Sequence, residues 1–507
     1  MKTYASIYIG TYEIVLKVFE ITKSKGIKEI DCLRSYCEIS RDISHLGKVS
    51  FETLDSMITV LKDMKSTVKT YKCDTYRVCA GYTLQNASNL YFVLDQINLK
   101  VNLKVEILSN SEQRFITYVA LASLPNFENI ISESALLVDI GGSSLQLTLF
   151  EEGEVITTEH ILLGANQVRE KLLRIKDKKD ANTQVTEMIK KEVGTFSNIY
   201  LKGTKPRYLI LINNQIHNVA SRIPVSSKDN IIPTELYTKT INKVKKKQIY
   251  AVISESFDID TDDEMMMPFI LLYQSIIEQI PSGNIMIPGI SISEGFAYDY
   301  AYQMNYLKAV HDFKGDILSA AWALAGRFDS YMPHLRALES FSLEIFDALK
   351  KSNKLTPRER LLMQVICILH DCGKYISLSS ASECAFTIIM SSEILGLSHN
   401  ERLLIAYVCA SHRSETPYSF DQMANQFSEE EYVRYLKLLA ILRIANAMDN
   451  SHKQKLKKIT VTLKENQLVI SVLANDSVTL EKGTFETKAD FFESIFHIRP
   501  MIREKRK

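Results

Sequence analysis

The feature that most constrains the fold is the segment at residues 136–150, which reads LLVDIGGSSLQLTLF. An apolar run ends in Asp139, and a second run after the serines alternates apolar and polar side chains. This pattern predicts two strands, and Gly141 and Gly142 predict the turn between them, because glycine adopts backbone angles that other residues avoid. Backbone N–H groups in such a turn can bind phosphate oxygens, and Asp139 can reach a metal ion. An ordinary hairpin fits the same residues, so both interpretations stay open on this segment alone.

A similar pattern lies near the start of the chain. Tyr4 to Ile9 alternates and predicts a strand, Gly10 and Thr11 predict a turn, and Glu13 to Ile21 predicts the partner strand. A third strand is expected around residues 27–33. Two such hairpins suggest two copies of a phosphate-loop unit.

Strands and helices alternate through the rest of the first 310 residues, which predicts a mixed α/β layer fold. Ser111 is expected to cap a helix with Glu112 in its first turn. The expected helices cover residues 51–71, 86–97, 111–124, 167–195, 234–246, 248–255 and 263–280. The expected strands cover residues 77–80, 105–108, 155–162, 207–213 and 285–287.

The pattern changes at about residue 312, after which no strand is expected before residue 458. A helical bundle is predicted here, followed by a hairpin turned at Glu465-Asn466 and a final helix near 488–498. The expected bundle helices cover 315–328, 331–352, 357–370, 380–395, 399–412 and 429–449. The predicted domains are a first lobe (1–130), a second lobe (131–310), a helical domain (311–455) and a C-terminal hairpin with a helix (456–507).

Length and charge exclude several classes of protein. A chain of 507 residues predicts several domains, and its net charge of +1 gives no overall field toward nucleic acid or a membrane. Basic runs at 243–247, 453–458 and 503–507 are interpreted as solvated faces and a tail. The eight cysteines form no C-x-x-C pair, and neither a signal peptide nor an apolar run long enough to span a membrane is recognised. A cytoplasmic protein with no nucleic-acid or membrane partner is therefore expected.

Five segments resemble motifs of the exopolyphosphatase/guanosine pentaphosphatase (Ppx/GppA) family, in the family's order. DIGGSS followed by Gln146 resembles DIGGGSTEL, and IYIGTYE (7–13) resembles the family's first phosphate loop. The other three are AGYTLQNASN (80–89), ILSNSEQRFI (107–116) and ISISEGF (290–296). The resemblance implies an actin-like ATPase (ribonuclease H-like) two-lobed α/β fold. It also implies Mg²⁺-dependent removal of terminal phosphate from polyphosphate or guanosine pentaphosphate.

The resemblance also implies roles for individual residues. Glu112 matches the family's catalytic glutamate, which would accept a proton from the attacking water. Asp139 would lie near Mg²⁺. The phosphate cradle would come from the backbone amides of Gly10, Thr11, Gly141, Gly142, Ser143 and Ser144.

The chain departs from the family pattern at positions that bear on catalysis. Tyr8 replaces an aspartate of the first loop, and Tyr12 and Glu13 replace an asparagine and a serine. Gln85 replaces an arginine, which removes a bidentate phosphate donor, and Gln146 replaces a glutamate. The loop after the strand at 207–213 also lacks the glycines that the family has there.

The helical part resembles the HD superfamily of metal-dependent phosphohydrolases, through ILHDCGKYI (368–376) and IANAMDNSH (444–452). His334, His370 and Asp371 would then hold a second divalent metal, since imidazole and carboxylate groups from several helices can close such a site. Asn446 stands where a fourth ligand, an aspartate, is usual. A hydrogen-bonded helix junction fits the same residues, and His412 is expected to cap or pack.

Two main hypotheses remain. The first is an active phosphohydrolase that cleaves polyphosphate or guanosine polyphosphates, based on Glu112, Asp139 and the DIGG loop. The second is a catalytically degenerate paralogue that binds polyphosphate or (p)ppGpp as a regulatory protein, based on the substitutions at Tyr8, Tyr12, Gln85, Gln146 and Asn446. An actin-like ATPase or sugar kinase is disfavoured by the third and fourth motifs. Because family members often dimerise through the C-terminal region, a homodimer is a further expectation.

Overall fold

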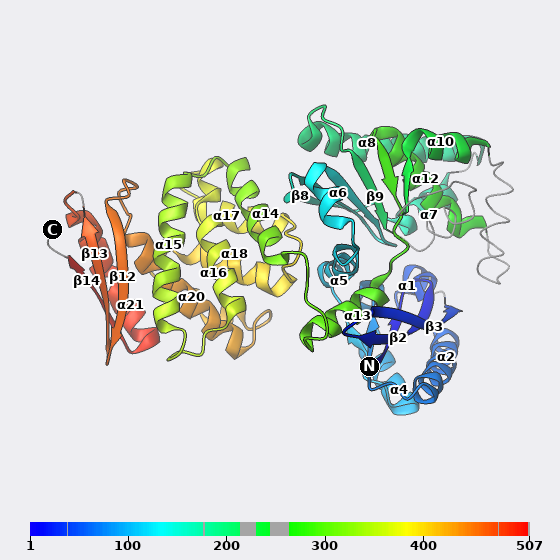
Figure 1. The fold of residues 1–507 in the computed structure, drawn as a ribbon, viewed down its shortest axis with the longest axis horizontal. Coiled ribbons are helices and arrows are strands. Elements are labelled where there is room, and N and C mark those ends of the chain that lie inside the picture. Colours follow the sequence, from blue (N-terminus) through cyan, green and yellow to red (C-terminus); the bar gives the residue numbers. More distant parts are fainter. Residues whose placement is uncertain (38, 176–177, 213–229, 244–262, 475, 505–507) are drawn as a thin grey trace. The chain divides into compact units, whose positions relative to one another are not determined.

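The computed structural model describes residues 1–507 except 38, 176–177, 213–229, 244–262, 475 and 505–507. It consists of two compact units, Met1–Asp312 and Phe313–Lys507 (Figure 1). The helix expected at 248–255 and the loop expected after residue 212 lie outside the described residues. Within the described part of the chain, no helix is long and apolar enough to cross a membrane.

The first unit contains two sheets that share one topology. In the first sheet, β2 pairs antiparallel with β1 and β3, while β4 pairs parallel with β1 and β5 pairs parallel with β4. Its five strands are β1 (Lys2–Ile9), β2 (Glu13–Thr22), β3 (Gly26–Tyr36), β4 (Thr75–Ala80) and β5 (Glu106–Ile107).

The second sheet repeats this arrangement. β7 pairs antiparallel with β6 and β8, β9 pairs parallel with β6, and β11 pairs parallel with β9. An additional edge strand, β10, is antiparallel to β11. The prediction of two copies of a hairpin unit is therefore confirmed. The six strands are β6 (Ala135–Ile140), β7 (Leu145–Glu151), β8 (Glu154–Ile161), β9 (Tyr208–Ile212), β10 (Ile231–Pro233) and β11 (Asn284–Met286).

Helices cover these sheets, as the alternating pattern predicts. The helices α1, α3 and α6, the π-helix η1 and the strand β10 were not expected from the sequence. The helices of this unit are α1 (Ile39–Leu46), α2 (Phe51–Thr70), α3 (Tyr82–Gln85), α4 (Leu90–Val101), α5 (Asn110–Ala122), α6 (Phe127–Glu133), α7 (Ala165–Arg174), α8 (Lys178–Phe196), the π-helix η1 (Ser197–Leu201), α10 (Thr234–Lys243), α12 (Asp263–Gln279) and α13 (Ile292–Gln303).

The strand β1 of the first sheet is buried on both faces. Ala5, Ile7 and Ile9 of β1 face a core formed with α2 and α4, while Tyr4 belongs to a separate cluster with Phe296 of α13. This alternation follows from the two-residue period of a strand. It places α13 against β1 and β2, so that the start of α13 lies beside the first hairpin turn.

The helices α5 and α13 cross in close contact. A Cβ atom on Gly295 would overlap the carbonyl oxygen of Ile116. Gly295 is part of the ISISEGF segment, so close backbone packing explains this glycine.

The second unit is a helical bundle followed by a small sheet. The predicted bundle helices are confirmed, and α21 packs against α20 and β14 (Figure 1). The strand β14, parallel to β13, was not expected. The elements are α14 (Phe313–Arg327), α15 (Met332–Leu349), α16 (Pro357–Leu369), the 3-10 helix η2 (Cys372–Tyr375), α17 (Ala381–Ser391), α18 (His399–Ser411), α19 (Phe420–Met423), α20 (Glu429–Ala447), β12 (Leu456–Lys464), β13 (Gln467–Ala474), α21 (Thr479–Phe496) and β14 (Arg499–Glu504).

Candidate functional site

The turns of the two hairpins, β1–β2 and β6–β7, have the same backbone hydrogen bond. The amide of Gly10 donates to the carbonyl oxygen of Glu13 over 2.8 Å, and the amide of Gly141 donates to that of Ser144 over 2.9 Å. The two copies of the unit thus present equivalent loops. We call residues 10–13 the first loop and residues 141–144 the second loop.

The two loops meet across a cleft. The hydroxyl of Tyr12 in the first loop donates to the side-chain oxygen of Asn166, which lies on α7 after the second loop. A Cβ atom on Gly142 would lie 3.1 Å from Cγ2 of Thr11. Both contacts bring the loops to the same opening, where a chain of phosphates could contact the two of them together.

A cavity of about 180 Å³ lies at this meeting point. Four of the six predicted phosphate-binding residues line it (Gly10, Thr11, Gly141 and Gly142), and Asp139 lines it as well. The other two do not. Ser144 is buried, and its hydroxyl accepts a hydrogen bond of 2.8 Å from Arg114, while Ser143 lies outside the lining.

The loop glycines were expected because glycine adopts backbone angles that other residues avoid, but the structure gives a different reason for them. Gly10, Gly141 and Gly142 do not adopt the left-handed backbone angles that the turn was expected to require. Gly142 is instead needed because Thr11 and Asn166 approach its Cα closely. Next to the loop, a Cβ on Gly164 would lie 2.5 Å from the carbonyl carbon of Ser143. Tight packing therefore accounts for Gly142 and Gly164, and for Gly10, whose Cβ would lie 3.0 Å from the carbonyl oxygen of Glu13, but not for Gly141, whose Cβ would have an ordinary contact.

Asp139 is the half-buried carboxylate of the cleft. Loss of contact with water raises its pKa, and the nearby Arg114 guanidinium partly offsets this effect. Burial, with the Asp139 charge adding to it, also raises the pKa of Tyr8, whose hydroxyl donates to Gln113 over 2.7 Å. A carboxylate with a raised pKa binds a proton or a cation readily, and oxygen ligands suit Mg²⁺. Asp139 therefore fits the role of a magnesium ligand, directly or through water.

The charges around the cleft are acidic. Glu13 is the second carboxylate of the lining, and it pairs with Arg34 over 3.3 Å. The described residues that line the cleft include no lysine or arginine. Phosphate would be repelled by Glu13 and Asp139 unless a cation bound with it.

Glu112 occupies a different position from the one its proposed role requires. Its carboxylate accepts hydrogen bonds from the amide and hydroxyl of Ser109 at 2.9 and 2.7 Å, which completes a capping box at the start of α5. The helix cap is therefore Ser109 and not Ser111, because Ser109 has the extended backbone that a cap needs. Glu112 is exposed and lines a separate cavity of about 440 Å³, beside Arg77 and Asp299.

Arg114 explains the environment of Gln146. The guanidinium is buried and donates to the side-chain oxygen of Gln146 over 2.9 Å and to Ser144. Gln146 stands opposite Asp139 in the pairing of β6 with β7. The side-chain amide of Gln146 thus accepts a hydrogen bond from Arg114. A glutamate at this position would place a second carboxylate beside Asp139, and the glutamine does not.

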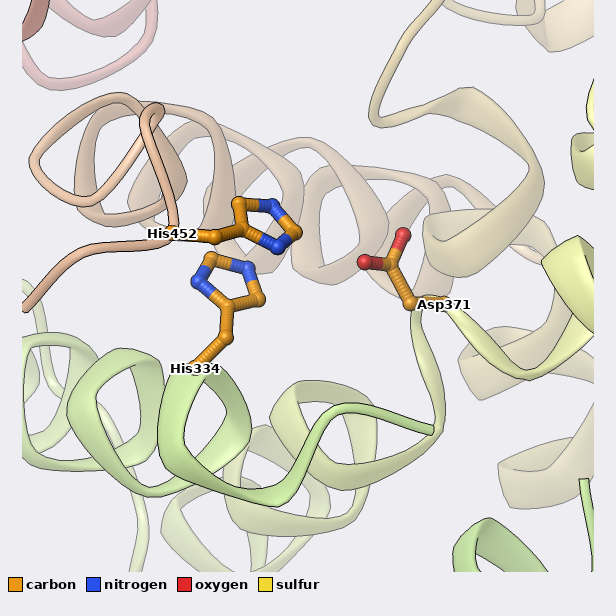
Figure 2. Close-up of side chains that lie close together, drawn as sticks. All are labelled: His334, Asp371 and His452. Carbon is orange, nitrogen blue, oxygen red and sulfur yellow. The ribbon is translucent and has the colours of Figure 1, made fainter. Parts of the chain in front are cut away.

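The second unit brings the other predicted residues together. His334, Asp371 and His452 form one group whose potential ligand atoms lie within 4.8 Å of each other, and His370, Asp371 and His412 form another. Figure 2 shows the rings of His334 and His452 stacked, with the Asp371 carboxylate facing their edges. Their ring centroids are 3.8 Å apart. The predicted residues His334 and His370 lie close together, with ring centroids 5.3 Å apart, and metal binding by them and Asp371 stays a prediction. His452 was not expected in this cluster.

Hydrogen bonds to the Nδ1 atoms orient the imidazole rings of this cluster. Nδ1 of His334 is bonded to the Asp449 carboxylate at 2.8 Å, and Nδ1 of His370 and of His412 lie 2.9 and 2.6 Å from the carbonyl oxygens of Cys367 and Cys409. Asp449, three residues after Asn446 in the sequence, therefore orients His334.

Charge around Asp371 is strongly positive. Its carboxylate accepts hydrogen bonds from Lys374 and, at 3.1 Å, from Arg413. Burial would raise its pKa, but His370, His412 and Arg413 outweigh that effect and lower it. Burial also lowers the pKa of His370 to about 3, so this ring is neutral at pH 7. Neutral imidazole is the form that binds metals.

Comparison with known families decides what the chain is. The model of the Ppx/GppA phosphatase family matches residues 18–299, which is more than half of the chain. The chain belongs to the Ppx/GppA phosphatase family. The model for domain III of Ppx/GppA phosphatases matches residues 319–484, within the second unit.

Individual relatives are distant. A guanosine-5'-triphosphate,3'-diphosphate pyrophosphatase of Photobacterium profundum is 19% identical over 93% of this chain and 92% of its own length. An exopolyphosphatase structure from Cytophaga hutchinsonii matches with a TM-score of 0.50 and 15% identity, over 61% of this chain and 99% of that one. A Ppx/GppA family structure from Aquifex aeolicus matches with a TM-score of 0.47 and 16% identity, over 60% and 99%.

These matches fix the fold and the family but no substrate. The first unit has the actin-like two-lobed α/β fold of Ppx/GppA proteins, and the helical domain follows it. The first and second loops stand at equivalent places in the two lobes of this fold.

Proposed function

We propose that this Ppx/GppA protein hydrolyses the terminal phosphoanhydride bond of inorganic polyphosphate or guanosine pentaphosphate in the cleft of the first unit. The observation that carries the proposal is that both glycine loops and Asp139 line one cavity. Backbone amides of these loops can cradle phosphate oxygens without a charged side chain. A carboxylate in the same cavity can hold a cation and order water beside the bound phosphate.

Each residue contributes a separate part of the proposed reaction. Asp139, with Glu13 nearby, would hold Mg²⁺, because a bound cation offsets the like charges of the two carboxylates. When bound, Mg²⁺ would neutralise the developing charge on the phosphate oxygens. The amide of Gly142 would orient the terminal phosphate for in-line attack by water, because the amide of Gly141 already donates to the carbonyl oxygen of Ser144.

The general base has two candidates. Glu112 matches the family's catalytic position, but its carboxylate must leave the Ser109 capping box to reach the cleft. Asp139 already lines the cleft, and burial raises the pKa of its carboxyl, which makes the carboxylate a stronger base. We propose that Glu112 acts after the cap opens on substrate binding, with Asp139 as the alternative.

The second candidate function is binding without turnover. Two observations favour it: Glu112 is held in the helix cap, and the described lining of the cleft holds carboxylates but no lysine or arginine. In this case the protein would bind polyphosphate or a guanosine polyphosphate as a regulatory ligand. Substrate recognition and catalysis would then be separate properties of the cleft.

Phosphate release from long-chain polyphosphate and from guanosine pentaphosphate, measured with Mg²⁺, distinguishes the two functions. We expect Glu112→Gln and Asp139→Asn each to lower turnover by about 100-fold or more, as loss of a general base does. Ser111→Ala, beside Glu112 but outside the capping box, is the matched control and should keep wild-type turnover. If wild type and both variants release phosphate only at background rate, the hydrolase proposal is wrong. Stabilisation of the wild type by the same ligands would then support binding alone.

A further inference from the structure

The inference concerns the cavity that Glu112 lines and is independent of the proposed function. This cavity, of about 440 Å³, lies in the first unit between the strands β1 and β4 and the helices α5 and α13. Its volume suits a small organic molecule, since ligand pockets enclose about 300–1,000 Å³. The proposed reaction takes place in the other cavity, so it gives this space no role.

Aromatic rings form much of the wall of this cavity. The aromatic side chains of the lining are Tyr4, Tyr76, Phe115, Phe296 and Tyr300. The rings of Tyr4 and Tyr300 stack with their centroids 4.8 Å apart. The guanidinium carbon of Arg77 lies 4.8 Å from the centroid of the Phe296 ring, a cation–π contact. The wall therefore suits a ligand with an apolar body and a positive charge, because aromatic faces attract cations.

The charges of the lining are mainly negative. Glu112 and Asp299 are its carboxylates, and Arg77 is the one basic side chain among the described residues that line it. Nε and Nη2 of Arg77 donate to the two carboxylate oxygens of Glu106, each over 2.9 Å. This bidentate pair offsets the positive charge of Arg77. Glu112 and Asp299 are left to set the charge of the cavity, which is negative.

Each of these two carboxylates has one oxygen without a hydrogen bond from the described residues. In Glu112, both contacts from Ser109 end at Oε2. In Asp299, Oδ2 accepts from the side-chain amide of Gln303 over 2.9 Å. Nη1 of Arg77 lies 3.6 Å from that same oxygen, which is too far for a hydrogen bond. Burial raises the pKa of Asp299, and Gln303 and Arg77 offset this effect only in part. The negative charge of Asp299 is thus incompletely compensated.

We propose that this cavity binds an organic ammonium ion, a small molecule with a protonated amine and an apolar body. Asp299 would accept a hydrogen bond from the amine, and Glu112 would add electrostatic attraction. The apolar body would pack on Tyr76 and Phe115. A phosphate ligand would be repelled by the two carboxylates, so the cavity and the cleft would bind ligands of opposite charge. A cation in the cavity would also favour the position of Glu112 at the start of α5.

Three probes that share one ring but differ in charge test this proposal on the full-length protein. They are benzylamine, which is positive at pH 7, benzyl alcohol, which is neutral, and benzoate, which is negative. We expect calorimetric titration to show one bound benzylamine per chain, with an affinity about tenfold or more above that of benzyl alcohol, because hydrogen bonds between charged groups are the stronger ones. Benzoate should not bind. Equal binding of the three probes, or no binding of benzylamine, would overturn the proposal.

A matched pair of variants assigns the bound probe to this cavity. Asp299→Asn keeps the size of the side chain but removes its charge, and it should weaken benzylamine binding by about tenfold or more. Asp63→Asn, which changes an exposed carboxylate on α2 outside the lining, should bind benzylamine as the wild type does. Thermal unfolding without a probe confirms that both variants are folded. Unchanged affinity in Asp299→Asn, or an equal loss in both variants, would contradict the assignment.

Discussion

The second loop should tolerate no side chain at Gly164, the residue that precedes α7. A methyl group there would lie 2.5 Å from the carbonyl carbon of Ser143 and still closer to the Gly142 carbonyl oxygen and the Ser144 amide nitrogen. All three are backbone atoms of the second loop, so no side chain can rotate away to make room. Gly164→Ala should therefore push the loop away from the start of α7.

The size of the effect follows from this overlap. Overpacking costs about 1–3 kcal/mol, and contact with backbone places this case at the upper end. Replacing glycine by alanine also stabilises the protein by roughly 0.4–1 kcal/mol, because alanine restricts the unfolded chain. The free energy of unfolding should therefore fall by about 2 kcal/mol in total. The first unit spans residues 1–312, so its unfolding entropy is about 0.65 kcal/mol per kelvin. Its unfolding temperature should fall by about 3 °C.

Calorimetry of the full-length chain measures this change, with polyphosphate binding measured in parallel. Gly141→Ala is the matched control in the same loop, because its methyl group would meet only the Ser144 carbonyl oxygen at an ordinary 3.5 Å. It should change neither property by much. If Gly164→Ala unfolds and binds like Gly141→Ala, then the packing explanation of the loop glycines is wrong.

Three further predictions concern the first unit. Burial would raise the pKa of Glu294, but attraction to Lys17 and their hydrogen bond lower it below the usual 4.5. The pair therefore stabilises the fold above about pH 4.5 and this contribution disappears as the pH falls, so denaturation curves of wild type and Glu294→Gln should differ at pH 7 and converge in acid. Ser109→Ala removes the cap of α5 and should lower stability by about 1 kcal/mol in urea unfolding, whereas an unchanged midpoint would contradict the assigned cap. Tyr12→Phe removes the hydrogen bond to Asn166 between the lobes and should speed polyphosphate association in stopped-flow measurements; an unchanged rate would show that this bond does not restrict entry to the cleft.

Periodicity in the sequence predicted most of the fold. The alternation in β1 and β2 and the helical spacing of α2 are local signals, and they match the observed elements closely. The strand β14 was missed because its main support is pairing with β13, which a local pattern cannot reveal. The short helix α1 was missed because few of its side chains are buried, so its sequence shows only a weak periodic apolar pattern.

The candidate cleft was predicted in part. Motif order brought Gly10, Gly141 and Asp139 together correctly, because each motif stands at a strand end and the paired sheets bring those ends to one place. Glu112 was assigned by its place in a motif. Its side chain is instead held by a local capping box, a competing use of the same carboxylate. The need for glycine at Gly142 arises from contacts across the cleft, which no local pattern carries.

The histidine cluster shows the same limit. His370 and Asp371 are adjacent in the sequence and were found as a doublet. His452 is the last residue of the segment 444–452, which resembles an HD-type motif. Its place in the cluster depends on the turn after α20, which brings its ring onto that of His334. The chain distance between these two histidines explains why spacing alone did not pair them.

The most direct test of the central claim is whether polyphosphate stabilises the first unit through the two loops. At a ligand concentration of about 100 times Kd, binding should add about 2.7 kcal/mol. With the unfolding entropy used above, the unfolding temperature of the first unit should rise by about 4 °C in the presence of Mg²⁺. Gly142→Ala, which crowds Thr11 of the opposite loop, should lose most of this shift, while Gly483→Ala in the second unit should keep it. No shift in the wild type, or an equal shift in Gly142→Ala, would contradict the assignment of this cleft as the phosphate site.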